Sequence, residues 1–259
     1  MGLRQGFTLI ELMTTVAIIV LLIGTVMPVM DGAVDLSEQA ICQSNQRQML
    51  IAWLNYNNDN HNRLVRGIPD DAEGWVQEGS GTDPIRNGKL FPYAEDVGLF
   101  KCPSDSAINE RSYSIVAPLH GERWDLHRTD PGHSWVQQGT DRFVDILNPA
   151  QQVVYMEESD PRTFGYPGPW NVGSWIMYVR ESYWWNWIDF VPNYHGRRDS
   201  ANLAFADGHV ELWKWQDPDT MQAADDGMFF YYEESNEDWL RIRKVYRQLQ
   251  RTPDVPWVR

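Results

Sequence analysis

An uncharged apolar run near the N-terminus constrains this chain more than any other feature. From Leu12 to Met30 there are nineteen residues without a charge, and only Thr14, Thr15, Gly24 and Thr25 interrupt their apolar character. An α-helix rises about 1.5 Å per residue, so a helix over this run covers about the 30 Å hydrocarbon core of a bilayer. The run predicts one membrane-spanning helix.

Two charges precede this run. They indicate the orientation of the helix in the membrane and a candidate functional residue. Arg4 is the single charge of the short leader, so the N-terminus is expected to stay cytoplasmic and the rest of the chain to lie outside. Glu11 lies at the start of the apolar helix. A carboxylate there costs roughly a few kcal/mol unless a cation pairs with it, which favours a functional role for Glu11.

The Gly-Phe-Thr-Leu-Ile-Glu string at residues 6–11 resembles the N-terminus of type IV prepilins and type II secretion pseudopilins. The resemblance implies cleavage after Gly6 by a prepilin peptidase and N-methylation of the new N-terminal Phe7. It also implies that Glu11 meets the Phe7 ammonium of a neighbouring subunit during assembly. Pro28 falls where such subunits often have a helix-breaking proline, which predicts a kink or local melting of the helix.

Two simpler interpretations compete with this one. A secretory signal has an apolar core of roughly 7–15 residues and a small-residue cleavage site, whereas this core is longer, contains Glu11 and has no such site after Met30. The run could also be a plain membrane anchor in which Glu11 has no role. We favour the pilin-like subunit.

The resulting division is a leader (1–6), a transmembrane and assembly helix (7–30) and an extracytoplasmic globular domain (31–259). The net charge of −14 argues against nucleic acid as a partner. Calcium binding by so acidic a domain is possible in principle, but no motif supports it. We predict no cofactor.

After the apolar run the helical pattern continues, with Leu36, Ile41, Met49 and Trp53 at helical spacings. The Cys-x-x-Asn-x-Arg-Gln pattern at 42–48 resembles a subgroup of pilin-like proteins. So do the Gly-x-Leu-x-Pro-Tyr and Cys-Pro-Ser-Asp strings that begin at positions 88 and 102. Prolines in these two strings predict short helices and turns.

The second half of the chain predicts strands and a final helix. Segments 113–116 and 152–157 are typical of short strands, and Asp-Gly within 202–213 predicts a two-residue type I′ hairpin that pairs Phe205 with Val210 and Leu203 with Leu212. An acidic loop and a helix capped by Asn236 follow. The expected fold is α+β: a long N-terminal helix packed on an antiparallel sheet, with loop insertions and a C-terminal helix. Trp75 is expected to anchor the polar loop before the first strand.

His195, Asp207 and Gly208 resemble the C-terminal His…Asp-Gly motif of pilin-like proteins from planctomycete- and verrucomicrobia-type bacteria. The intervening segment 196–206 is longer than usual in that group, which indicates a longer loop between His195 and the turn. We interpret Asp207 as a turn residue rather than a catalytic one.

Two cysteines, Cys42 and Cys102, could form a disulfide or remain two buried thiols. Neither they nor His120, His127 and His133 have the spacing of a zinc site, so we predict no metal.

Aromatic residues are dense between positions 166 and 194 and include Trp184, Trp185 and Trp187. They could form a core, a subunit contact or a sugar-stacking face. The last of these supports an alternative function, a membrane-tethered extracytoplasmic carbohydrate-binding protein that uses the pilin-type signal for export.

No nucleophile elbow, P-loop, zinc-protease or dinucleotide motif is present in the sequence, so we predict that the chain is not an enzyme. A third hypothesis, an extracytoplasmic hydrolase, would depend on Asp207 or His195. The favoured function is a structural subunit of a type II secretion or type IV pilus-like filament. Its expected partners are prepilin peptidase and other pilin subunits, and its expected location is the inner membrane, with a single pass.

Overall fold

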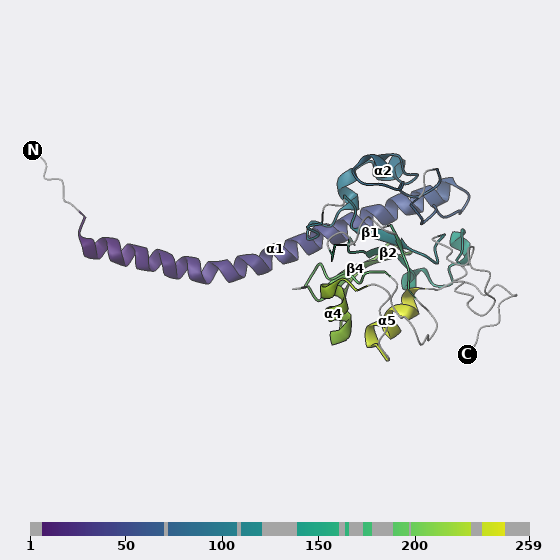
Figure 1. The fold of residues 1–259 in the computed structure, drawn as a ribbon. Coiled ribbons are helices and arrows are strands. Elements are labelled where there is room, and N and C mark those ends of the chain that lie inside the picture. Colours follow the sequence, from purple (N-terminus) through teal and green to yellow (C-terminus); the bar gives the residue numbers. More distant parts are fainter. Residues whose placement is uncertain are drawn as a thin grey trace, which may run out of the picture.

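The computed structural model describes residues 7–69, 72–107, 110–120, 139–160, 164–165, 173–177, 189–196, 198–228 and 235–246. Its dominant element is one helix of 51 residues, α1 (Leu9–Asp59). Figure 1 shows the first half of α1 projecting from a globular body and the second half lying across that body. A five-stranded sheet packs beneath it, so the α+β class is confirmed.

The helix α1 begins at a capping box. Thr8 Oγ1 accepts a hydrogen bond from the Glu11 backbone N–H (3.3 Å), and the Glu11 carboxylate accepts one from the Thr8 backbone N–H (2.9 Å). The helix then runs without interruption through Pro28, so the local melting expected there is not found. Figure 1 shows a curved helix instead. Proline removes one backbone hydrogen bond, and the turns on either side remain bonded.

The second half of α1 is amphipathic, and its buried residues recur every three or four positions. Leu36 and Ile41 were expected to belong to this side but are 66% and 48% exposed. The buried residues are Cys42, Gln46, Met49, Leu50, Ala52, Trp53 and Asn57. Cys42 is therefore the first side chain of α1 that the body encloses.

The sheet has the strand order β3-β1-β2-β4-β5. The strand bounds are β1 (Tyr113–Val116), β2 (Val153–Glu157), β3 (Ser174–Trp175), β4 (Ser200–Phe205) and β5 (Val210–Lys214). The pairs β1–β2, β2–β4 and β4–β5 are antiparallel, as expected, but β3 lies parallel to β1. The sheet is therefore mixed, and the prediction of a purely antiparallel sheet is wrong. The strand β3 comes from the aromatic segment, where no strand was predicted.

The Asp-Gly hairpin is present, but its loop is longer than predicted. The Phe205 N–H donates to the His209 carbonyl (2.9 Å) and the Gly208 N–H donates to the Phe205 carbonyl (2.9 Å), so three residues form the loop. Only Gly208 has a positive φ (100°), whereas a type I′ turn needs positive φ at both central residues.

This longer loop shifts the pairing of the two strands by one residue. Leu203 faces Glu211 rather than Leu212, so the expected Leu203–Leu212 and Phe205–Val210 pairs are wrong. All six residues of β4 are buried, because helices cover both faces of the sheet there. On the edge strand β5, Leu212 is 38% exposed.

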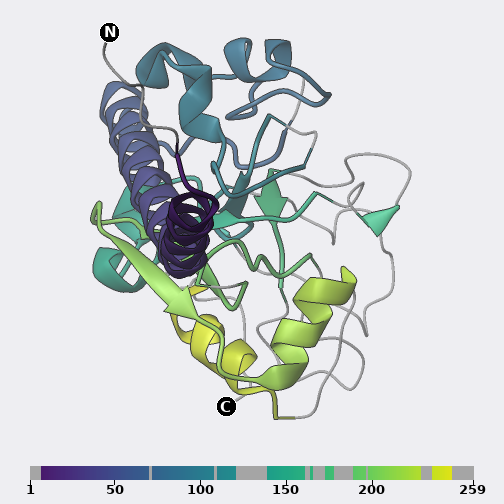
Figure 2. The ribbon, with the colours of Figure 1, turned by 90° about the vertical axis from the view of Figure 1, so that its left-hand side faces the viewer.

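Two helices cover the face of the sheet opposite α1, as Figures 1 and 2 show. The helix α5 (Glu237–Tyr246) begins as predicted at Asn236, whose side chain accepts a hydrogen bond from the Trp239 N–H (2.8 Å). The helix α4 (Pro218–Asp226) occupies a segment that was predicted to be an acidic loop. The Asp217 side chain caps it by accepting from the Asp219 N–H (3.0 Å).

Short helices lie in the connection between α1 and β1, where Pro92 and Pro103 predicted short helices and turns, and also in the connection between β1 and β2, where none was predicted. They are α2 (Asp83–Arg86), α3 (Phe91–Ala94), η1 (Val97–Phe100), η3 (Phe143–Asp145) and η4 (Pro149–Gln151). Trp75 is fully buried beside them, and its indole N–H donates to the Gly173 carbonyl (2.9 Å). Its predicted role as the anchor of this loop is confirmed.

Replacing Trp53 on α1 tests how much the packed half of this helix contributes to stability. Trp53 is fully buried, so Trp53→Ala should lower the free energy of unfolding by about 3–5 kcal/mol. Urea unfolding of the detergent-solubilised chain, followed by circular dichroism, measures this difference. Ile51→Ala removes a side chain that is 58% exposed on the same helix and should change stability by about 0.5 kcal/mol or less. Equal losses in the two variants would contradict this packing.

Candidate functional site

The first half of α1, called the apolar rod below, is an apolar helix that no other described part of the chain covers. Every side chain from Phe7 to Met27 is exposed, and the exposed fraction of the large apolar ones ranges from 48% at Ile23 to 77% at Phe7. The helix is long and apolar enough to cross a membrane. Exposed apolar surface on this scale marks an interaction with lipid or with other apolar helices.

Glu11 is the one carboxylate on this rod. Its Oε2 accepts hydrogen bonds from the backbone N–H (2.9 Å) and the hydroxyl (2.7 Å) of Thr8. Its other oxygen has no partner among the described residues. The carboxylate is thus held at the tip of the helix, beside Phe7, and can still accept a further donor.

A second notable site is buried in the globular body, where four elements meet. Cys42 comes from α1, Cys102 from the segment after η1, Glu157 from the end of β2 and His195 from the turn before β4. All four are 0% exposed. One donor atom from each lies within 4.8 Å of the other three. These four residues are called the buried cluster below.

The contacts inside the buried cluster converge on one carboxylate oxygen. The Cys42 thiol donates to Glu157 Oε1 (2.7 Å), and His195 Nε2 lies 2.9 Å from the same oxygen. Cys102 Sγ lies 3.5 Å from His195 Nε2. A thiol, a carboxylate and an imidazole therefore face one another around a common centre.

Neighbouring polar groups hold each member of the buried cluster in place. The Asn202 backbone N–H donates to Glu157 Oε2 (2.9 Å), and the Asn202 side-chain amide donates to Oε1 (3.3 Å). Ser104 Oγ lies 3.4 Å from His195 Nδ1, and the Tyr113 hydroxyl lies 3.1 Å from Cys42 Sγ. Asn202 is itself fixed, because two glutamines of α1 donate to it, Gln43 to its side-chain oxygen and Gln46 to its carbonyl.

Burial and mutual contact shift the protonation of these groups. Burial raises the pKa of the Cys42 thiol well above its usual value, and the nearby Glu157 charge adds to this. The polar contact with the Cys42 thiol lowers the pKa of Cys102. Burial opposes the charged form of His195, but its hydrogen bonds and charge interactions with Cys102 and Glu157 outweigh burial and raise its pKa to about 10.

A tight turn aims His195 into the buried cluster. The His195 backbone N–H donates to the Ser200 carbonyl (3.1 Å), and the His195 carbonyl accepts from the N–H groups of Asp199 and Ser200 (3.1 Å each). The chain reverses through Gly196, whose φ is +63°. A Cβ on Gly196 would lie 2.5 Å from the Asp199 carboxylate and the Ser200 hydroxyl.

The structure separates the members of the predicted His…Asp-Gly motif. His195 lies before β4, whereas Asp207 and Gly208 lie in the loop after it. Asp207 accepts hydrogen bonds from the His209 backbone N–H (3.1 Å) and lies 2.5 Å from His209 Nδ1. This geometry favours the interpretation of Asp207 as a turn residue.

The two cysteines are free thiols in this structure, although it brings them together. Of the two alternatives left open by the sequence, the structure has the buried thiols and not the disulfide. Glu157 was missed as a site residue, since the pattern at 152–157 predicted only a short strand. A charged residue at the end of an otherwise apolar strand was the available signal.

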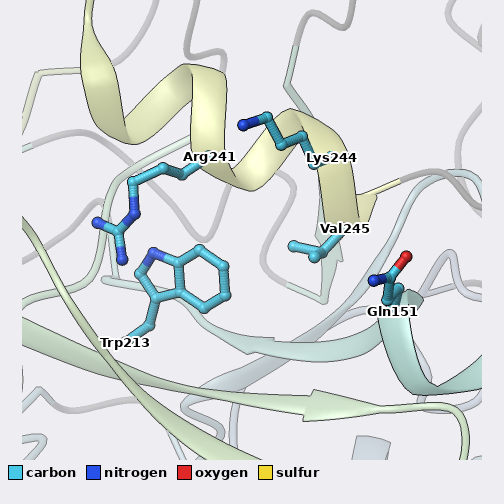
Figure 3. Close-up of a pocket in the computed structure, with 5 residues that line it drawn as sticks. All are labelled: Gln151, Trp213, Arg241, Lys244 and Val245. Atoms are coloured by element: carbon cyan, nitrogen blue, oxygen red, sulfur yellow. The ribbon is translucent and has the colours of Figure 1, made fainter.

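A separate surface pocket of about 330 Å³ lies between β5 and α5. Figure 3 shows Arg241 over the ring of Trp213, and their separation is 4.8 Å from guanidinium carbon to ring centroid. Gln151, Lys244 and Val245 complete the lining. The Arg241 guanidinium already pairs with Asp238 (2.6 Å), and the pocket shares no lining residue with the buried cluster.

Some predicted residues lie outside the described part of the chain. They are Gly6 of the cleavage site, Trp184, Trp185 and Trp187 of the sugar-stacking hypothesis, and the loop histidines His127 and His133. His120 is described, and its Nδ1 lies 2.9 Å from the Leu64 carbonyl. The carbohydrate-binding alternative therefore stays a prediction.

Comparison with known proteins gives no matching family model, no significantly similar curated protein and no significantly similar solved structure. The function is argued below from the residues and their geometry.

Substituting Gly196 tests whether its turn is needed to position His195. Gly196→Ala combines an unfavourable positive φ with a close contact, whereas Gly208→Ala has a positive φ but nothing within 4 Å of the new Cβ. Gly208→Ala should therefore cost about 1–2 kcal/mol, and Gly196→Ala clearly more. Thermal unfolding of the two variants measures the difference. Equal melting temperatures would show that the turn can relax without cost.

Proposed function

We propose that this chain is a pilin-like structural subunit of a type II secretion or type IV pilus-like filament. In this proposal a prepilin peptidase cleaves after Gly6, and the subunit waits in the inner membrane with residues 31–259 outside. It then assembles through the apolar half of α1. The observation that carries the proposal is the bare apolar rod continuous with a packed helix.

The length of the rod fits both of its proposed environments. The segment from Leu9 to Met30 has 22 residues, and about 1.5 Å of rise per residue makes it roughly 33 Å long. In the membrane, lipid would cover this surface. In a filament, the same surfaces of neighbouring subunits would cover one another, so assembly exchanges one apolar environment for another.

The geometry at the N-terminal end of α1 supports a role for Glu11 in setting the longitudinal register between neighbouring subunits. Both of its hydrogen bonds come from Thr8 and use Oε2, so Oε1 remains for a donor from outside the subunit. Cleavage after Gly6 would create an ammonium at Phe7, only four positions before Glu11. Inside an apolar bundle a carboxylate is stable only with a cation, so one longitudinal offset between subunits would be preferred.

Replacing Glu11 tests this role directly. Glu11→Leu should remain inserted and processed but should be lost from filaments, because nothing would then neutralise the Phe7 ammonium of the neighbouring subunit. Filaments sheared from cells and probed for the subunit measure incorporation. Asp31→Leu removes a carboxylate from the same helix just beyond the apolar run and is expected to be incorporated. Normal filament content of the Glu11→Leu variant would refute the proposed role.

The mature N-terminus provides an independent test of processing. Mass spectrometry of the chain isolated from its native membrane should find Phe7 as the first residue, carrying one added methyl group. Gly6→Val should block cleavage and leave the leader attached. A native chain that still begins at Met1 would contradict the proposal.

A further inference from the structure

The buried cluster has the residue types and the spacing of a metal site. Two thiols, one imidazole nitrogen and one carboxylate oxygen form a donor set that suits zinc. In a tetrahedral zinc site with bonds of about 2.0–2.3 Å, neighbouring donor atoms lie about 3.3–3.8 Å apart. The donor atoms of the cluster all lie within 4.8 Å of one another, so a small contraction or expansion of each distance would produce that geometry.

The groups around the buried cluster orient it as a metal site requires. Glu157 Oε2 is held by the Asn202 N–H, which leaves Oε1 directed at the centre. His195 presents Nε2 to the centre, while Nδ1 faces Ser104 Oγ. A ligating histidine usually has its second nitrogen bonded in this way, and a ligating carboxylate is usually hydrogen-bonded as well.

A bound divalent cation would offset most of the charge that its ligands carry. Metal binding would ionise both thiols, and Cys42, Cys102 and Glu157 would then hold three negative charges in a space that is 0% exposed. Buried charges need a partner of opposite sign, and a divalent ion would reduce the total to one negative charge. The Tyr113 hydroxyl and the Asn202 amides face that remaining charge.

We propose that the buried cluster binds one Zn²⁺ ion through two thiolates, one imidazole nitrogen and one carboxylate oxygen. Binding requires that both sulfur atoms and His195 Nε2 give up their protons to solvent, and four protein ligands leave no open position, so the site is structural rather than catalytic. The ion joins α1 to the sheet, to the segment after η1 and to the His195 turn. Cys42 is the first enclosed residue of α1, so the ion fastens the helix where it leaves the body. This inference stands independently of the filament proposal.

The full-length chain in detergent micelles, purified from zinc-supplemented cells and dialysed, tests the site. Elemental analysis should find one zinc per chain. A chelator should lower the melting temperature, and one equivalent of Zn²⁺ should restore it. Replacement by Co²⁺ should give the thiolate-to-cobalt charge-transfer band and the intense visible bands of tetrahedral cobalt. This spectrum reports on the ligands independently of stability.

Variants of the buried cluster and its neighbours test whether the cluster binds a metal ion or only forms hydrogen bonds among its own side chains. Glu157→Gln keeps the size of the side chain and one acceptor oxygen but removes the carboxylate charge, and it should weaken zinc binding by more than about 100-fold. Asn202→Ala leaves all four ligands and should weaken it by about 10–100-fold. As a matched control, His209→Ala removes a half-buried histidine outside the buried cluster, one that contacts Asp207 and Glu211, and should retain the zinc.

Four outcomes would overturn the proposal. One is folded wild-type chain that contains no zinc after supplementation. Another is a cobalt spectrum without the thiolate band. The third is a Cys42–Cys102 disulfide, detected by mass spectrometry as the loss of two hydrogens in the chain as isolated. The fourth is a wild-type melting temperature that a chelator leaves unchanged, because the proposed site is structural.

Discussion

The structure depends on how a buried carboxylate is satisfied where α1 meets the sheet. Glu157 has no exposed surface, and an unpaired carboxylate in that position would be strongly destabilising. Its partners come from three separate parts of the chain: Cys42 of α1, Asn202 of β4 and His195 of the turn before β4. A shift of α1 by one turn would remove Cys42 from this set, so the carboxylate selects one position of the helix on the sheet.

This constraint lies at the boundary between two environments of the same helix. Before Cys42 no described side chain of the helix is buried, and after it an apolar stripe packs on the body through Met49 and Trp53. Apolar packing alone tolerates sliding, because one aliphatic side chain can replace another in a similar space. The hydrogen bonds from Gln46 and Cys42 do not tolerate sliding of the helix, because each has one fixed partner.

Local signals in the sequence predicted most helices and strands. They failed where packing between residues distant in the sequence decided the structure. Asn236 caps α5 as predicted, because a cap depends only on the residues that follow it. The hairpin register was wrong by one residue, since the Asp-Gly pair is compatible with two loop lengths and the packing of the strands selected the longer one. The helix α4 was taken for a loop, although Asp217 followed by Pro218 is a typical helix start.

The sequence by itself determined the apolar segment, its single carboxylate and the amphipathic continuation, because each is a pattern in neighbouring residues that periodicity or composition reveals. The buried cluster was decided only by the tertiary structure. Cys42 and Glu157 are 115 positions apart, and Cys102 and His195 are 93 apart. No local pattern relates such residues, and the zinc spacings that are recognisable in sequence come from ligands close together in the chain. The four residues of the buried cluster meet because α1 crosses the sheet above the end of β2. This crossing follows from packing the apolar side of α1 on one face of the sheet, since both surfaces had to be buried.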